Sequence, residues 1–183
     1  KQILEKNKII ENRTSVDYLK DFQKINDEIN NIDSCDDWWD LYLRLVEWEL
    51  KFEEHEDSGL NNILFEQIQS CNKAFSKFIE NNYKDLIKKD AHSILSPSVF
   101  RNHALPKLKE HEKVCIIIVD CMRCDQFLSV IPYLESLFNI ELTYHMSLIP
   151  SATPYSRNAI FSGLYPDELI ERYPNQKKLF QNN

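Results

Sequence analysis

Glycine is scarce in this chain, and its scarcity excludes two common kinds of nucleotide-binding site. Among 183 residues, only Gly59 and Gly163 are glycines. The P-loop and the GxGxxG turn of dinucleotide-binding domains both need several glycines, because their backbone must approach the phosphates closely. Any phosphate chemistry of this protein must therefore use another kind of site.

The sequence also has no long apolar run and no strongly basic region. No stretch reaches the 18 or so apolar residues of a membrane span, and no signal peptide is visible. The net charge is −7, and residues 113–183 carry 6 basic and 7 acidic side chains. Duplex DNA needs a concentrated basic surface, so we expect no duplex DNA partner and no membrane span.

The five cysteines are an odd number, which does not suit a scaffold of paired disulfides. Three of them, Cys115, Cys121 and Cys124, lie within ten residues of one another. This usage is typical of a protein kept reduced, and it predicts a cytoplasmic location.

Residues 1–112 show helical periodicity in three segments. The apolar positions are Val16, Leu19, Phe22, Ile25 and Ile29 in the first segment, Trp38, Trp39, Leu41, Tyr42, Leu45, Trp48 and Phe52 in the second, and Leu60, Ile63, Leu64, Ile68, Cys71, Phe75, Phe78, Ile79 and Leu86 in the third. Ser34 and Asp37 resemble a capping box at the start of the second segment. The pattern predicts an up-and-down helical bundle with the aromatic face as its core; a surface for a partner helix is the alternative.

After residue 112 the pattern changes to that of an α/β protein. Residues 114–119 are continuously apolar, as in a strand buried on both faces. A helix over 125–138, a strand over 140–148 and a helix from Thr153 to Gly163 follow. This order predicts the N-terminal part of a parallel α/β sheet, and two strands alone make that sheet incomplete. We therefore expect two domains, a helical one over 1–112 and the start of an α/β domain over 113–183.

Asp120 and Thr153 each follow a predicted strand, at the end where open α/β sheets bind their ligands. Asp120 suits a divalent metal, although it could equally cap the next helix. Thr153, which precedes Pro154, could likewise be only a helix cap, or its hydroxyl could meet a phosphate at the helix N-terminus. Arg123 and Asp125 either pair with each other or orient Asp120.

Two segments resemble a known family. The residues Asp120, Arg123, Asp125 and Gln126 resemble the D-x-x-R-x-D-Q signature of the PglZ domain, a branch of the alkaline phosphatase superfamily. Residues 149–164 resemble the nucleophile segment of that domain. They are also similar to the T-x-P-N-x-x-x-x-x-T-G-L-Y-P run of nucleotide pyrophosphatase/phosphodiesterases, with residues 163–166 in register. This register puts Thr153 at the nucleophile.

The helical region resembles the middle domain of PorX-type response regulators, on the residues Trp39, Leu45, Val46, Trp48, Glu49 and Leu50. Proteins of that type join a receiver domain, a helical domain and a PglZ domain, and they are associated with type IX secretion. The resemblance implies a segment of a two-component response regulator with a receiver domain upstream in the same protein.

The family implies metal-dependent phosphoester hydrolysis, as a phosphodiesterase with a nucleotide-type substrate. Asp120 would bind a zinc ion, and Thr153 would bind the same zinc and attack phosphorus, with two zinc ions in the complete domain. Arg123 and Asp125 would support the metal ligands or bind substrate.

Two residues of the nucleophile segment could contact the phosphate. Arg157 could face it, although it could as well pair with a carboxylate on the helix surface. Ser156 stands where the related phosphodiesterases carry an asparagine that holds the phosphate. The superfamily supplies its other Asp and His ligands downstream, and no histidine follows His145. We therefore expect residues 1–183 alone to be inactive.

Two other functions fit parts of the sequence. The helical region could act as a signalling module that forms a homodimer, with no enzymatic role. Cys121 and Cys124 form a CxxC after a predicted strand, as in thiol redox proteins. The cysteines occupy the variable positions of the PglZ-like signature, which accounts for them without redox chemistry.

Overall fold

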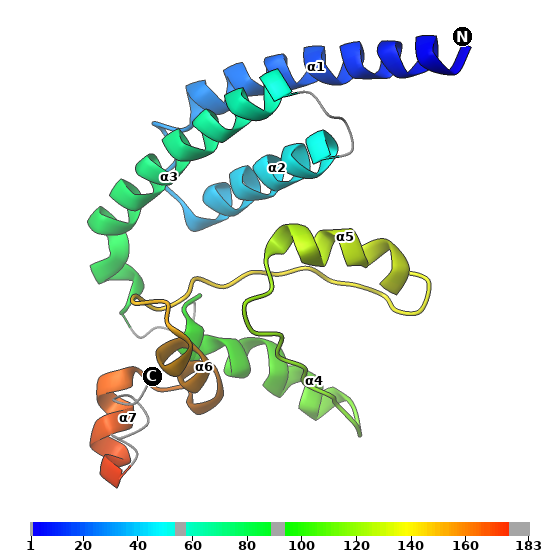
Figure 1. Ribbon diagram of the computed structural model, residues 1–183. Helices are drawn as coiled ribbons and strands as arrows, with labels where there is room; N and C mark the ends of the chain where they lie inside the picture. Colours follow the sequence, from blue (N-terminus) through cyan, green and yellow to red (C-terminus); the bar gives the residue numbers. More distant parts are fainter. Residues whose placement is uncertain (1, 54–57, 89–93, 176–183) are drawn as a thin grey trace. The chain divides into compact units, whose positions relative to one another are not determined.

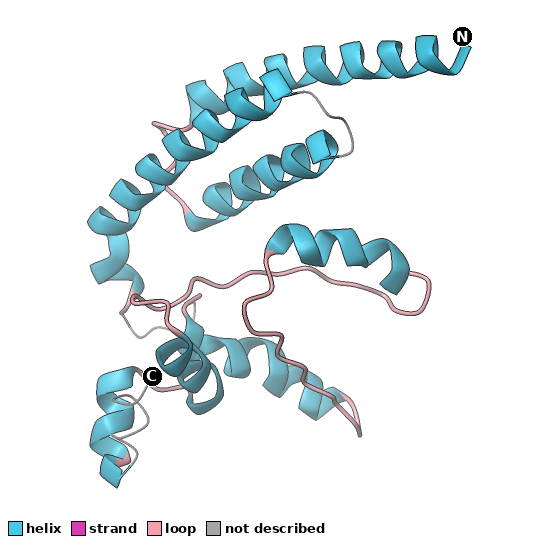
Figure 2. Cartoon of the chain, viewed as in Figure 1, coloured by secondary structure: helices cyan, strands magenta, loops and turns pink. Residues whose placement is uncertain are grey.

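The structure is a computed structural model that describes residues 2–53, 58–88 and 94–175. These residues form seven α-helices and no β-strand (Figures 1 and 2). The helices are α1 (Gln2–Glu28), α2 (Cys35–Glu53), α3 (Ser58–Leu86), α4 (Leu105–Glu110), α5 (Cys124–Leu134), α6 (Thr153–Ser162) and α7 (Pro166–Arg172). The chain divides into two compact units, one of residues 1–82 and 123–140, and one of residues 83–122 and 141–183.

The first unit contains the predicted helical bundle, and most of the predicted apolar positions of α2 and α3 form its core, whereas Tyr42 and Ile63 are 45% and 36% exposed. The buried side chains come from α1, α2 and α3, and they are Tyr18, Ile25, Trp38, Leu41, Leu45, Trp48, Phe52, Leu64, Cys71 and Phe78. Aromatic rings meet edge to face inside this core, as between Tyr18 and Phe52, whose centroids are 5.0 Å apart at 85°. Such pairs add about 0.5–1.5 kcal/mol beyond the burial of their area.

The predicted apolar stripe of α1 is partly wrong. Val16 and Leu19 are 51% and 48% exposed, whereas Tyr18 is fully buried. The buried stripe therefore runs through Tyr18, Phe22 and Ile25, at spacings of four and three residues. The hydroxyl of Tyr18 argued against a buried position in the sequence. In the structure this hydroxyl donates a hydrogen bond to Gln67 Oε1 over 3.2 Å, so the polar group has a partner within the core.

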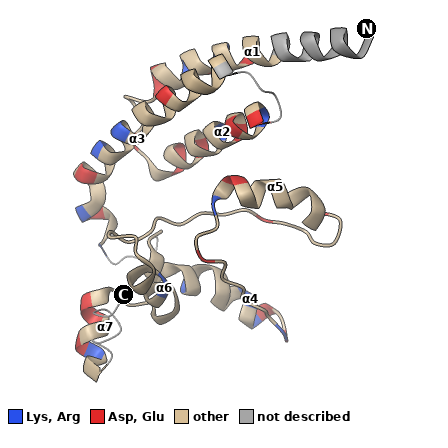
Figure 3. Ribbon diagram, in the orientation of Figure 1, with Lys and Arg blue, Asp and Glu red and all other residues tan. Residues whose placement is uncertain are grey.

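Polar contacts fix the ends and sides of α2. The Ser34 hydroxyl accepts a hydrogen bond from the Asp37 amide over 3.1 Å, which confirms the predicted cap. Farther along the helix, Arg44 pairs with Asp21 of α1 over 2.8 Å. Figure 3 shows that most charged side chains of α2 are acidic, whereas both signs occur along α3.

Helix α5 belongs to the first unit, although it lies about 70 residues beyond α2 in the chain, and it packs on α2. The sequence predicted a helix over 125–138, and the observed helix begins and ends slightly earlier. Its N-cap is Arg123, whose backbone amide donates to Gln126 Oε1 over 3.1 Å.

The second unit surrounds a small core of Leu95, Leu148 and Ala159. A short 3₁₀ helix, η1 (Ser96–Ser98), and a π-helical turn, η2 (Phe100–Ala104), lead into α4. These three short elements place helical turns along residues 96–110. Gly163 ends α6 as predicted, with a left-handed φ of 67°.

The α/β start predicted for residues 113–183 is not confirmed. The segments 114–119 and 140–148 run without regular secondary structure, and the only β-type pairing among the described residues is one isolated parallel bridge between Leu95 and Met146. A strand is defined by the hydrogen bonds of a neighbouring strand, and residues 114–119 have no such partner here. Ile117 and Val119 are accordingly 79% and 60% exposed.

None of the described helices combines the length and apolar character needed to cross a membrane. The boundary predicted between residues 112 and 113 stays a prediction. Residues 176–183 of the second predicted domain lie outside the described residues.

Candidate functional site

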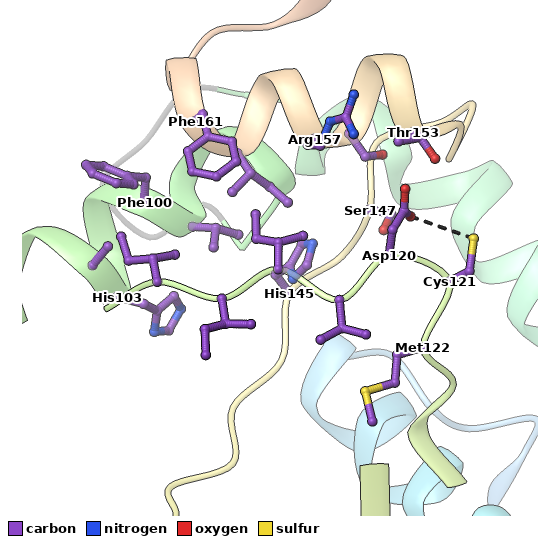
Figure 4. Close-up of a pocket in the computed structure, with 18 of the residues that line it drawn as sticks. Phe100, His103, Asp120, Cys121, Met122, His145, Ser147, Thr153, Arg157 and Phe161 are labelled. Atoms are coloured by element: carbon purple, nitrogen blue, oxygen red, sulfur yellow. Dashed lines mark hydrogen bonds between the residues drawn. The ribbon is translucent and has the colours of Figure 1, made fainter. Parts of the chain in front are cut away.

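A cavity of about 670 Å³ lies within the second unit (Figure 4). The segment 114–122 lines one side of it, and α6 lines another with Thr153, Ser156 and Arg157. The turn η2 and the residues His145, Ser147 and Ser151 complete the wall. Four residues predicted from the sequence, Asp120, Thr153, Ser156 and Arg157, therefore share one cavity, whereas Arg123 and Asp125 do not line it.

Asp120 stands on the cavity wall at the end of the apolar segment, and its side chain is exposed. Figure 4 shows its carboxylate directed toward the end of α6 that carries Thr153 and Arg157. The alternative role as a helix cap does not apply, because Arg123 is the N-cap of α5. The Cys121 thiol donates to Asp120 Oδ1 over 3.7 Å, which leaves the second carboxylate oxygen for a ligand.

Thr153 is the first residue of α6 and therefore lies at the N-terminus of that helix. Ala152 is the N-cap and makes no side-chain cap, so Thr153 does not have the capping role that was its alternative. Pro154 follows in the first turn, where proline is well tolerated because a backbone N–H at that position has no acceptor within the helix. Thr153 is half-buried and faces the cavity (Figure 4).

The Ser156 hydroxyl is buried and lacks a hydrogen-bond partner among the described atoms. A helical serine usually bonds to the carbonyl four residues earlier, but the Ala152 carbonyl already accepts the amides of Tyr155 and Ser156 over 3.0 and 3.1 Å. A buried polar atom without a partner costs about 1–3 kcal/mol, and it is a common mark of a site that is completed by a ligand.

The charged side chains on the cavity wall are few: Asp120 is acidic, and Lys107 and Arg157 are basic. Arg157 is exposed on α6 and lies on the same side of the cavity as Thr153. Arg157 and the positive end of the α6 dipole favour an anion at the Thr153 end of the cavity, whereas the Asp120 carboxylate favours a cation there.

Arg123 and Asp125 pair with each other at the start of α5. Arg123 Nε donates to Asp125 Oδ1 over 2.9 Å, and a second bond joins the Arg123 and Asp125 side chains. The hydrogen bond from Arg123 lowers the pKa of Asp125 below its usual value. The sequence left two roles open for this pair. In the structure, Arg123 and Asp125 bond to each other.

The two cysteines of the CxxC are free thiols. Burial raises the pKa of the Cys124 thiol, and the neighbouring Asp125 carboxylate raises it further. A reactive redox cysteine needs the opposite change, because the thiolate is the nucleophile.

Sequence reasoning missed most of the cavity wall. His145 and His103 both line it, and burial together with His103 lowers the pKa of His145. Phe100 and Phe161 line the apolar end (Figure 4). None of these residues belongs to a recognisable motif, so only the three-dimensional arrangement reveals them.

The residues present do not supply a complete metal site. No group of three or more His, Cys, Asp or Glu side chains is placed to hold a metal ion anywhere in residues 2–53, 58–88 and 94–175. Asp120 and Thr153 could offer two oxygen ligands, fewer than the four that zinc normally takes.

Comparison with protein families gives two matches. Residues 8–87 match the PorX response regulator linker domain, and residues 99–179 match the BREX system PglZ alkaline phosphatase-like domain. Among curated proteins, none matches this sequence. The two families are those that the sequence motifs resemble, in the same order along the chain.

Proposed function

Because this chain joins a PorX-type response regulator linker to a PglZ-type alkaline phosphatase-like domain, we propose that it is part of a response regulator that hydrolyses phosphoesters with Thr153 as nucleophile. The observation that carries the proposal is the shared cavity. Asp120, Thr153 and the unpaired Ser156 hydroxyl all line it, at the N-terminus of α6.

In the proposed reaction, the Thr153 oxygen attacks phosphorus and the bond from phosphorus to the leaving oxygen breaks. The hydroxyl proton passes to solvent water, the leaving oxygen departs with its bonding electron pair, and the phosphoryl group stays covalently on Thr153 until water attacks phosphorus and releases the threonine oxygen. The half-buried position of Thr153 at a helix N-terminus suits this step, because the helix dipole favours the negative charge that gathers on the phosphate.

Ser156 and Arg157 are proposed to hold the phosphate. The buried Ser156 hydroxyl would gain the hydrogen-bond partner that it lacks, and Arg157 would offset the negative charge of the phosphate oxygens. A phosphodiester of nucleotide type is the proposed substrate class, on the resemblance of residues 149–164 to the phosphodiesterase segment.

Alkaline phosphatase-like domains are generally metal-dependent, and we propose Asp120 and Thr153 as zinc ligands. Zinc bound there would lower the pKa of the threonine hydroxyl and offset charge on the phosphate. Among the described residues, no group of three His, Cys, Asp or Glu side chains is arranged to complete such a site. The α/β fold belongs to the same proposal, since the exposed apolar run over 114–119 suits a strand that pairs with neighbouring strands.

A receiver domain in the same protein is the proposed source of regulation, because the linker family takes its name from response regulators. We further propose a cytoplasmic location and a role in type IX secretion, and we leave homodimer formation as a property of the helical region to be measured.

The test is hydrolysis of bis(p-nitrophenyl) phosphate by the full-length protein with added zinc. We expect Thr153→Val to lose at least about 10³-fold in rate, because a variant without its nucleophile keeps only binding and electrostatic effects. Thr153→Ser keeps a hydroxyl and should retain part of the activity.

Thr143→Val is the matched control, since Thr143 is exposed and does not line the cavity. Its rate should equal that of the unchanged protein. Equal rates for Thr153→Val and Thr143→Val, with both proteins folded, would remove Thr153 as nucleophile.

A further inference from the structure

The last turn of α3 matches the linker family in sequence but belongs to the second unit by its contacts. Residues 8–87 match the linker family, so Tyr83 and Leu86 are linker residues. The boundary between the two compact units falls between residues 82 and 83, within α3. The linker region thus contributes one helical turn to the unit that contains the cavity and Thr153.

Tyr83 holds the chain on the N-terminal side of Thr153. Its hydroxyl accepts a hydrogen bond from the Ile149 backbone amide over 2.8 Å. Farther along, Ala152 is already the N-cap of α6. Only residues 150–151 lie between these two attachment points, and each residue of an extended chain spans at most about 3.3–3.6 Å. Because this connection has little slack, a displacement of Ile149 moves the start of α6.

The loop that contains Ile149 is also attached to η1. The Ser96 amide donates a hydrogen bond to the Met146 carbonyl over 3.1 Å, and the Leu148 amide donates to the Ser96 hydroxyl over 3.2 Å. The bond from Ile149 to Tyr83 extends these attachments one residue farther toward α6. Linker and η1 residues therefore hold consecutive amides of the same loop.

The last turn of α3 also supports α6 beyond Thr153. The buried core of the second unit includes Leu148 and Ala159, which are 3% and 1% exposed. Tyr83 and Leu86 are half-buried and pack against this core. Ala159 lies six residues after Thr153 on the same helix. One turn of α3 thus reaches the structure on both sides of Thr153, the loop through a hydrogen bond and the helix through the shared core.

We infer that Tyr83 is a positioning residue for Thr153, which it holds at the cavity through the Ile149 amide, while Leu86 supports α6 through the shared core. The linker region thereby helps to place Thr153, although neither Tyr83 nor Leu86 lines the cavity. The location of Thr153 depends on Tyr83 whatever the cavity binds, whereas an effect on catalysis rests on the proposed function.

The first test is backbone amide NMR of the 183-residue chain without added metal. Tyr83→Phe keeps the ring and loses the acceptor, and we expect the Ile149 amide to exchange about tenfold faster. The resonances of Ala152 and Thr153 should shift in the same variant. Tyr133→Phe is the matched control, since Tyr133 is 77% exposed in the first unit, and it should leave all three amides unchanged.

Gly163→Ala separates positioning from stability. Gly163 ends α6 on the side away from Thr153, with a φ of 67°, so alanine there should destabilise the second unit through backbone strain. We expect the melting temperature to fall about as much as in Tyr83→Phe, while the Ile149 and Thr153 resonances stay in place. Thr153 resonances that shift equally in both variants would overturn the inference, as would a Thr153 resonance that Tyr83→Phe does not move.

The second test measures bis(p-nitrophenyl) phosphate hydrolysis by the full-length protein with zinc. If Thr153 is the nucleophile, Tyr83→Phe should lower kcat about tenfold and change KM less than about twofold, because a misplaced nucleophile slows chemistry more than binding. Gly163→Ala should keep the kcat of the unchanged protein. An unaltered kcat in Tyr83→Phe would overturn the positioning role. An inactive unchanged protein would contradict the proposed function and leave the NMR shifts to decide whether Tyr83 places Thr153.

Discussion

The backbone amide of Ile149 donates a hydrogen bond to the Tyr83 hydroxyl over 2.8 Å. This bond joins the last turn of α3 to the loop that leads, through Pro150, into α6 and Thr153. The loop is also held on its other side, where the Leu148 amide donates to the Ser96 hydroxyl over 3.2 Å. The start of the α6 segment therefore depends on two side-chain acceptors contributed by distant parts of the chain.

Tyr83→Phe removes one of these acceptors while keeping the ring. We expect a loss of about 1 kcal/mol in the free energy of unfolding and faster exchange of the Ile149 amide, because that amide is left without its protein partner. Amide exchange by NMR measures the effect, and Tyr173→Phe on an exposed tyrosine is the control. An unchanged Ile149 exchange rate would contradict this role of Tyr83.

Asp21 is predicted to be the most sensitive acidic residue of the helical bundle. Its carboxylate accepts one hydrogen bond from Trp48 Nε1 over 2.7 Å and another from Arg44 over 2.8 Å. Asp21→Ala leaves both donors without this partner, and we expect it to cost about 2–3 kcal/mol of stability. Denaturant unfolding followed by tryptophan fluorescence checks it, beside Asp17→Ala on the exposed side of α1. Equal midpoints for the two variants would refute the prediction.

Gly163 is the position where the backbone most requires glycine. Its φ is 67°, and a Cβ added there would meet only the Pro97 carbonyl oxygen at 3.6 Å, which is an ordinary contact. Gly163→Ala should therefore cost about 1 kcal/mol through backbone strain alone. Gly163→Asn should cost less, since asparagine tolerates this conformation. The melting temperatures of the two variants measure the difference, and the reverse order would disprove the explanation.

His145 should make the second unit less stable in acid. Burial lowers the pKa of His145 below its ordinary value of 6.5, and His103 adds to the effect. The unfolded chain then binds a proton at a pH where the folded chain does not, so stability present above the unfolded pKa declines as the pH falls from about 7 through 6.5 toward the folded value. Calorimetry of His145→Gln between about pH 7 and 5 should show a flatter decline. The exposed His111→Gln should match the unchanged protein.

Helical periodicity predicted the three helices of the bundle in the first unit and most of their buried positions. The buried faces of α2 and α3 and the cap at Ser34 follow from local spacing, which a sequence displays directly. The stripe of α1 was misplaced because a buried tyrosine is recognisable only through its partner, Gln67 on another helix. The packing of α5 on α2 could not be predicted from the sequence either, because the two helices lie far apart along the chain.

For the candidate site, the motifs pointed to Asp120, Thr153, Ser156 and Arg157, which share a cavity, and also to Arg123 and Asp125, which do not line it. The sequence predicted that Asp120 and Thr153 lie near each other, because each residue follows an apolar segment and precedes a predicted helix. The same reasoning predicted a strand over the apolar segment 114–119, and the described residues form no strand there. Strand formation depends on a neighbour, and a single sequence segment carries no information about whether one is present.

Mass spectrometry of acid-quenched protein detects whether Thr153 becomes covalently phosphorylated. After the full-length protein is mixed with bis(p-nitrophenyl) phosphate and zinc, we expect a nitrophenyl phosphoryl group on the peptide that contains Thr153. The peptide should be unmodified in Thr153→Val. A phosphoryl group on a different residue, or turnover of the substrate with Thr153 never modified in a fast-quench time course, would contradict the proposal that Thr153 is the nucleophile.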